Sequence, residues 1–238
     1  MEVTTKGIVF STIKYGEADL IVHCFTESDG LKSYLLRRIL TARKGKLKMS
    51  LFQPLMLLEL VAIHKNKGTL ERIKEAKVAH PFKSLHANVS KSGMVLFLAE
   101  MLKNSIQEEE KNRELFQYIE NALLWLDEHD AIANFHILFL LKLSAYLGFY
   151  PDASNIESQY FNLSEGNFQE SPFGTYCEEG LKVEALKGFF GIDFDALPQI
   201  KLTKKVRLET LDLMLRYYQL HIQSYKRPKS LLVLNQLY

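Results

Sequence analysis

The fold is decided by residues 7–36, GIVFSTIKYGEADLIVHCFTESDGLKSYLL. This stretch holds apolar runs rich in β-branched and aromatic residues, which are typical of strands. Two turn signals, Tyr15-Gly16 and Ser28-Asp29-Gly30, separate the runs. We therefore expect three short strands joined by tight turns, at residues 7–14, 20–25 and 31–36.

Two further runs extend this pattern. Residues 51–63 are a long apolar run, and Asn66-Lys67-Gly68 is a hairpin turn signal. Residues 70–79 then mix apolar and charged side chains, as a strand with one solvated face does. Five short antiparallel strands within residues 1–80 predict a small β-barrel, because closure of the sheet removes its exposed edges.

The periodicity changes at Pro81, after which apolar residues recur every three or four positions. That spacing indicates helices. We expect them at residues 89–106, 115–126, 131–147, 184–190 and 204–225. Residues of about 152–182 are polar and aromatic without helical spacing, and are interpreted as a small irregular insertion. The predicted fold is therefore α+β, with a barrel domain at 1–80 and a mainly α-helical domain at 81–238.

Composition excludes several classes of protein. The chain is 47% hydrophobic and 24% charged, as ordinary globular proteins are. Its N-terminus carries no apolar secretory segment, and its most apolar stretch, residues 135–143, is too short to span a bilayer. Only two cysteines are present, Cys24 and Cys177. These features predict a cytoplasmic protein without a membrane partner.

Charge is distributed unevenly between the two predicted domains. Residues 1–80 hold 14 Lys and Arg against 8 Asp and Glu, whereas residues 81–238 hold 16 against 20. A basic module joined to a mildly acidic one suggests that the first domain meets a polyanion.

The basic residues of the first domain are concentrated in residues 32–48, which contain no acid. These are Lys32, Arg37, Arg38, Arg43, Lys44, Lys46 and Lys48. Cations along a groove neutralise successive phosphates and release counterions, and Tyr34 could add a stacking surface for a base. This segment predicts DNA binding that is largely independent of sequence. The alternative is a solvated basic loop without a ligand.

Several short motifs occur in an order that resembles the RecO family of recombination mediators, over nearly the whole chain. The motifs are Lys6-Gly7-Ile8-Val9, Tyr15-Gly16-Glu17-Ala18-Asp19-Leu20, Thr26-Glu27-Ser28-Asp29-Gly30-Leu31, the basic stretch at Arg37-Arg38, Leu51-Phe52-Gln53-Pro54-Leu55, Leu147-Gly148-Phe149-Tyr150-Pro151-Asp152 and His221 to Ser230.

The resemblance implies an N-terminal OB-fold followed by a helical domain. It also implies a mediator of DNA repair and recombination that binds single- and double-stranded DNA, anneals complementary strands and helps RecA to load. Its implied partners are RecR and the acidic tail of single-strand-binding protein, which ends in an apolar aromatic residue. The expectation is a protein with no catalytic centre and no cofactor.

The sequence departs from the family at a metal site. Many RecO proteins carry a four-cysteine zinc ribbon in the insertion, and such a site needs four Cys or His ligands. Here Cys177 stands alone, and residues 155–159 contain no cysteine. We therefore predict that the protein binds no zinc.

A partner site is expected on the helices of residues 89–147. An acidic, apolar tail needs an apolar pocket beside a cation. Lys142 interrupts the apolar run 137–143 and is the candidate, although a lysine that snorkels to solvent is the alternative.

Two other functions remain open at this stage. One is a protein-interaction adaptor whose basic barrel binds an acidic partner rather than DNA. The other is a nuclease or phosphotransferase with an unrecognised acidic site, for which the basic domain offers no clustered carboxylates.

Overall fold

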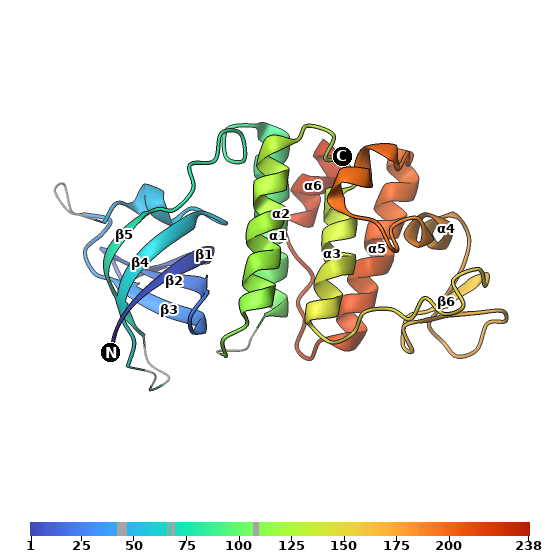
Figure 1. The fold of residues 1–238 in the computed structure, drawn as a ribbon, viewed down its shortest axis with the longest axis horizontal. Coiled ribbons are helices and arrows are strands. Elements are labelled where there is room, and N and C mark those ends of the chain that lie inside the picture. The colour runs from blue at the N-terminus through green and yellow to red at the C-terminus, as the bar shows by residue number, and fades with distance from the viewer. Residues whose placement is uncertain (42–46, 66, 68–69, 107–109) are drawn as a thin grey trace. The chain divides into compact units, whose positions relative to one another are not determined.

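The computed structural model describes residues 1–41, 47–65, 67, 70–106 and 110–238. The chain divides into two units, Met1–Asp127 and Glu128–Tyr238. The first contains a five-stranded sheet and the helices α1 and α2, and the second contains the helices α3 to α6 and a small sheet (Figure 1).

The sheet of the first unit is antiparallel, with strand order β3-β2-β1-β4-β5. Its strands are β1 (Glu2–Tyr15), β2 (Asp19–Thr26), β3 (Gly30–Leu36), β4 (Leu57–Ile63) and β5 (Arg72–Val78). The two edge strands approach each other at one parallel bridge between Tyr34 and Glu71. There the Leu35 N–H donates to the Glu71 carbonyl at 3.0 Å, and the Glu71 N–H donates to the Ser33 carbonyl at 2.7 Å.

Side chains alternate across the strands, so every second residue enters the barrel core. Val22, Tyr34, Leu60 and Ile73 all lie in this core. The α+β fold class, with five N-terminal strands followed by helices, is confirmed. The edges meet at a single bridge rather than along a full ladder, so the barrel of this OB-fold is only partly closed.

The composition of residues 51–63 indicated a single strand, but the structure divides this run. A 3-10 helix, η1 (Met49–Phe52), and a turn precede β4. Pro54 cannot donate a backbone hydrogen bond, and Leu55 adopts a left-handed conformation with φ of 58°. The turn instead pairs with a bulge in β1, where the Leu55 N–H donates to the Val9 carbonyl at 2.7 Å.

Helices α1 (Val89–Ser105) and α2 (Arg113–Glu128) belong to the first unit up to Asp127. α1 begins where the Asn88 side chain accepts the N–H groups of Ser90 and Lys91. It packs against β1. A buried Lys91 ammonium donates to the Asp127 carbonyl at 2.9 Å, at the carboxyl end of α2.

The Asp127 side chain completes this junction. Its carboxylate accepts backbone N–H groups from Lys83, Ser84 and Leu85 at 2.7–2.9 Å. Burial raises the pKa of Asp127, but these hydrogen bonds outweigh burial and hold it below its usual range. The segment that follows the sheet is therefore anchored to α2.

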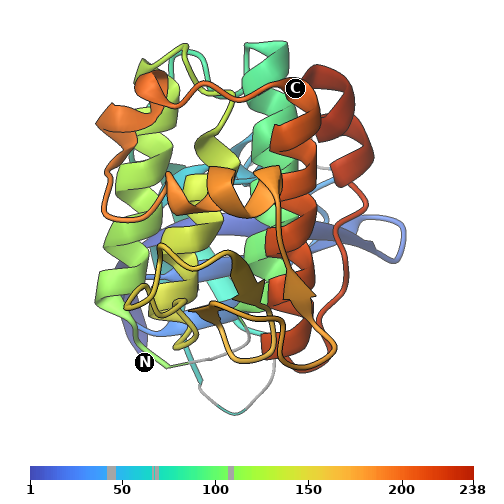
Figure 2. The same cartoon turned by 90° about the vertical axis from the view of Figure 1, so that its right-hand side faces the viewer.

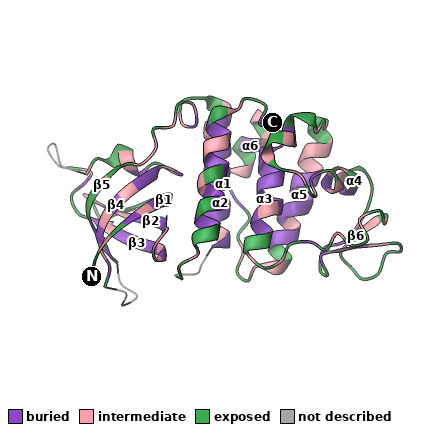
Figure 3. Ribbon diagram, in the orientation of Figure 1, coloured by how far each residue is buried: buried purple, intermediate pink, exposed green. Residues whose placement is uncertain are grey.

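The second unit is mainly helical, as expected. Its elements are α3 (Phe135–Tyr146), β6 (Tyr160–Asn162), β7 (Asn167–Gln169), β8 (Cys177–Glu178), α4 (Leu181–Lys187), η2 (Phe194–Gln199), α5 (Lys204–His221) and α6 (Leu231–Leu237). The sequence did not predict α6. Helices α3 and α5 both belong to the second unit (Figure 2), they pack together, and both carry buried residues (Figure 3).

The insertion forms the three-stranded sheet β7-β6-β8. Aromatic rings form its core: Phe161 lies 4.9 Å from Phe168 and 5.6 Å from Tyr217, measured between ring centroids. The side-chain oxygen of Asn162 accepts the N–H of Ser164 at 3.0 Å, and its side-chain nitrogen donates to the Phe173 carbonyl at 2.9 Å. Aromatic packing and one buried amide therefore hold the insertion together.

Candidate nucleic-acid interface

The predicted basic segment follows β3. Among its residues, Arg37, Arg38 and Lys48 are exposed. Arg38 adopts a left-handed conformation with φ of 55°, and its N–H donates to the Asp19 carboxylate at 2.7 Å. Arg43, Lys44 and Lys46 lie outside the described residues. Arg38 is therefore held against the β1–β2 turn.

Two predicted DNA-binding residues face the barrel interior instead. Lys32 is 8% exposed, and Tyr34 is 0% exposed. Both share the inward side of β3 with Leu36, because residues two apart on a strand point the same way. The Tyr34 ring thus has no exposed face for a base, which corrects the expectation that it provides a stacking surface.

Tyr34 belongs instead to a buried hydrogen-bonded chain. Its hydroxyl lies 2.8 Å from His64 Nε2, and His64 Nδ1 lies 3.0 Å from the Asp29 carboxylate. With Nδ1 donating to the carboxylate, Nε2 accepts from the hydroxyl. Burial raises the pKa of Tyr34, so the phenol stays protonated. This chain joins β3, the β2–β3 turn and the residue after β4.

A cleft of about 650 Å³ opens where the end of β3 meets the start of β5. Its cations are Arg37, Lys65 and Arg72, all exposed. Its apolar lining comprises Leu35, Leu36, Ile39, Leu47, Ile63, Leu70 and Ile73. Glu71 is the acid in this lining. Exposed cations beside apolar side chains suit a polyanion that also carries flat apolar groups.

Sequence reasoning missed Lys65 and Arg72, which flank the predicted hairpin turn rather than the basic segment. The Glu71 carboxylate anchors this region, because both of its oxygens accept the Lys65 N–H at 2.9 Å. Only the bridge between Tyr34 and Glu71 brings these cations beside Arg37. The hairpin turn at residues 66–68 could have pointed to these two cations, because OB-folds use the loop between strands 4 and 5 for binding.

The cleft cations differ from two cations of the first unit that have internal partners. Lys6 pairs with Glu120 at 2.7 Å, and Arg113 pairs with Glu27 at 3.1 Å. Within the part of the chain that the structure describes, Arg37, Lys65 and Arg72 make no ion pair. No described acid therefore neutralises their charge.

In the second unit, Lys142 is half-buried on α3. Its ammonium donates to the Asp193 carboxylate at 2.6 Å. This hydrogen bond holds the pKa of Asp193 below its usual range. Lys142 thus has the anionic partner that a cation within an apolar run requires.

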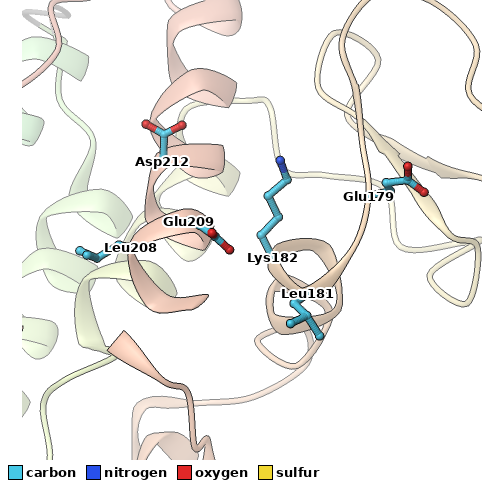
Figure 4. A pocket seen from close by; sticks show the side chains of 6 residues that line it. All are labelled: Glu179, Leu181, Lys182, Leu208, Glu209 and Asp212. Carbon is cyan, nitrogen blue, oxygen red and sulfur yellow. The ribbon is translucent and has the colours of Figure 1, made fainter. Parts of the chain in front are cut away.

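A pocket of about 450 Å³ lies between α4 and α5 (Figure 4). Its lining residues are Glu179, Leu181, Lys182, Leu208, Glu209 and Asp212. Lys182 pairs with Glu178, and Asp212 pairs with Arg227. Glu209 also pairs with Lys205, at 3.9 Å. Because the second unit itself neutralises three of these charges, this pocket offers less to an external ion than the cleft does.

The two cysteines occupy different environments. Cys24 is buried in the barrel core, and burial raises the pKa of its thiol to about 12. The Cys177 thiol donates to the Phe173 carbonyl at 2.9 Å. Within the described ranges, no group of three His, Cys, Asp or Glu side chains is placed to hold a metal ion. That the protein binds no zinc stays a prediction.

The described helices include none with the length and apolar character needed to cross a membrane. Comparison with known proteins finds two family models. "Recombination protein O N terminal" matches residues 1–82, and "Recombination protein O C terminal" matches residues 86–231.

Similar full-length proteins are named DNA repair protein RecO. The one from Christiangramia forsetii is 50% identical, and the one from Flavobacterium psychrophilum is 47% identical, each over 100% of both chains. A third, from Bacteroides fragilis, is 34% identical over 98% of both chains.

Proposed function

Because the chain belongs to the RecO family of DNA repair proteins, which act in recombinational repair, we propose that it binds DNA at the cleft between β3 and β5. The bound DNA is single- or double-stranded. In this proposal the protein anneals complementary strands and helps RecA to load, with RecR as its partner.

One observation carries this proposal: three exposed cations without ion-pair partners among the described residues surround one apolar cleft. Arg37 follows β3, whereas Lys65 and Arg72 flank the β4–β5 turn. Arg38 and Lys48 are exposed nearby in sequence, and Arg43, Lys44 and Lys46 extend the same basic segment. Such a surface attracts phosphates without reading bases, so binding is expected to be independent of sequence.

The test is a titration of labelled single-stranded DNA at several salt concentrations with a Arg37→Ala, Lys65→Ala, Arg72→Ala triple variant. We expect affinity to fall at least about tenfold. If each side chain contacts one phosphate, the log–log salt slope should shrink by about 2, since each contact contributes about 0.7 for single strands.

A matched control removes three exposed cations from the second unit, Lys201, Lys204 and Lys229. It changes net charge equally and should leave affinity nearly intact. Equal losses in both variants would reduce the cleft to a general charge effect. Failure of the parent to bind bare oligonucleotides, with binding to an acidic peptide retained, would favour the adaptor function instead.

Annealing follows physically from the same surface. Cations that neutralise phosphates on two strands reduce the repulsion between them, so complementary bases can pair. The triple variant should therefore lose acceleration of annealing together with DNA affinity. Addition of RecR and RecA to DNA covered with single-strand-binding protein tests the mediator activity, and the triple variant should fail to restore filament formation.

We also propose that the acidic tail of single-strand-binding protein docks beside Lys142. The ammonium already holds the exposed Asp193 carboxylate, and the residues beside it on α3, Leu141 and Leu143, are buried. A tail carboxylate could replace Asp193 as the partner of Lys142.

This arrangement gives opposite expectations for two variants. Lys142→Ala should weaken binding of a synthetic tail peptide, whereas Asp193→Ala should strengthen it by removing the internal competitor. Lys187→Ala is the control, because Lys187 pairs with Glu184 in the same way, at 2.7 Å. If neither Lys142→Ala nor Asp193→Ala alters peptide affinity, the tail does not dock at this position.

A further inference from the structure

We propose that the row Ile13, Ile21 and Leu35 on the outer face of β1, β2 and β3 holds unpaired bases, with Tyr15 beside it as the stacking platform, so that single-stranded DNA crosses this row into the cleft. This inference rests on the proposed DNA binding and deepens it: it names the strand state that the surface selects.

Tyr15 is an exposed aromatic side chain on a well-defined turn. It ends β1, pairs in register with Asp19, and is 54% exposed. Gly16 follows with φ of 62°, a conformation that a side chain rarely tolerates and that turns the chain into β2. In the part of the chain that the structure describes, Tyr15 has no ring neighbour and no hydrogen bond of its side chain. Its faces are therefore available to a ligand.

An apolar row connects the Tyr15 side of the sheet to the cleft. Ile13 pairs with Ile21, and Ile21 pairs with Leu35. All three point outward, because the alternate residues Leu20, Val22, Tyr34 and Leu36 fill the barrel core. Ile13 is 45% exposed, and Ile21 and Leu35 are half-buried. Leu35 also lines the cleft, so the row and the cleft share a residue.

Cations accompany this row at the end near Tyr15. The Arg38 N–H donates to the Asp19 carboxylate at 2.7 Å, and the Leu40 N–H donates to the Ala18 carbonyl at 3.0 Å. These bonds hold the residues after β3 against the Tyr15 turn. Arg37, Arg38 and Lys14 are exposed there, and Glu17 is the exposed acid of the same turn. Cations therefore outnumber exposed acids beside the aromatic ring.

A further cation lies near the other side of the face. The next cross-strand row on the outer face lies two residues away from Ile13. It consists of Ser11, His23 and Ser33, which are paired in register. Burial lowers the pKa of His23, and the charge of Lys103 on α1 lowers it further. Lys103 is exposed. The apolar row thus has exposed cations at its Tyr15 end, and the charge of Lys103 acts on the neighbouring row, which complements a strand with bases down and phosphates out.

Stacking is the interaction that separates single strands from duplexes here. The bases of a duplex are stacked and paired inside it, so a ring on a sheet surface reaches only unpaired bases. Phosphate contacts are shared by both forms and do not discriminate between them. Loss of the ring should therefore reduce affinity for single strands and leave duplex affinity unchanged.

The experiment compares Tyr15→Ala, Tyr15→Phe and Tyr15→Trp in titrations of labelled single-stranded and hairpin-duplex DNA. Tyr15→Ala should lose about five- to a hundredfold in single-strand affinity, the range of one stacked base. Phe and Trp should retain it, and duplex affinity should stay within about twofold for all three. The matched control is Tyr176→Ala, which removes an exposed tyrosine from the insertion.

The outcomes separate this inference from the function on which it rests. Unchanged single-strand affinity in Tyr15→Ala would overturn the stacking platform, and so would an equal loss for duplex and single strands. If the cleft triple variant loses affinity while Tyr15→Ala does not, DNA binding stands and only the platform fails. A parent protein that binds neither DNA would overturn both.

Discussion

We call the cleft and the adjoining Tyr15 turn the barrel mouth. The barrel mouth and the insertion of the second unit differ in whether their charged and aromatic side chains have internal partners. In the insertion, Arg216 pairs with Glu178, and Phe161 is buried against other rings. At the barrel mouth, Arg37 makes no ion pair among the described residues, and Tyr15 is exposed. Arg216 and Phe161 thus have partners within the second unit, whereas Arg37 and Tyr15 have none among the described residues.

This difference separates stability from binding. A change in the insertion should cost free energy of unfolding and leave DNA affinity intact. A change at the mouth should do the reverse, since exposed groups without internal partners contribute little to folding.

The largest expected effect is on the insertion core. Phe161→Ala should lower the free energy of unfolding by about 3–5 kcal/mol, because it removes a fully buried ring from an aromatic cluster. Urea denaturation measures this loss, and DNA titration below the transition should give the parent affinity. Phe173→Ala is the control, because that ring is 79% exposed and should change stability by less than about 0.5 kcal/mol. A specific fall in DNA affinity in Phe161→Ala would break the comparison.

The second prediction concerns the pH dependence of the helical unit. Burial lowers the pKa of His136 from 6.5 to about 3, and the charge of Arg207 adds to this effect. Below pH 6.5 His136 binds a proton in the unfolded chain, whereas in the folded protein it does so only near pH 3. The free energy of unfolding therefore decreases as the pH is lowered from about 6.5 to about 3.

His136→Gln should remove that contribution, which amounts to about 1.4 kcal/mol between about pH 7.5 and about pH 5.5. Urea denaturation at both pH values measures it as the difference between parent and variant. A variant that loses as much stability on acidification as the parent does would show that His136 is not the responsible group.

The third prediction is that a change at the barrel mouth lowers DNA affinity and leaves stability unchanged. Arg37→Ala should weaken single-strand DNA binding about three- to tenfold and shrink the salt slope by about 0.7, with stability unchanged within about 0.5 kcal/mol. Arg37→Lys should recover the slope, because it restores the charge. A loss of stability larger than the loss of binding would mean that Arg37 supports the fold.

The smallest expected effect is that of metal removal. Within the described residues the insertion is held by rings and the Asn162 amide, with no assembled metal ligands. Dialysis against a strong chelator should therefore leave the melting temperature unchanged, and elemental analysis should find less than one zinc per chain. A stoichiometric metal lost together with stability would contradict this view of the insertion.

Individual residues show which features of the structure local sequence patterns could predict. The period-two pattern of β3 places Lys32 and Tyr34 on the same side as Leu36, so their burial was accessible from the sequence. The cluster of basic residues at 32–48 instead predicted an exposed position for both. By contrast, no local pattern predicted that Pro54 and Leu55 would interrupt the run 51–63. The turn is stabilised by its long-range hydrogen bonds to the β1 bulge.

By itself the sequence determined the α+β class, the strand and helix periods and the basic character of the first 80 residues, since these depend on local alternation and composition. Which cations share a site depends on long-range contacts of the folded chain. The bridge between Tyr34 and Glu71 joins segments 37 residues apart and brings Lys65 and Arg72 beside Arg37. Register and strand order set that proximity, and no window of sequence contains both partners of a long-range pair.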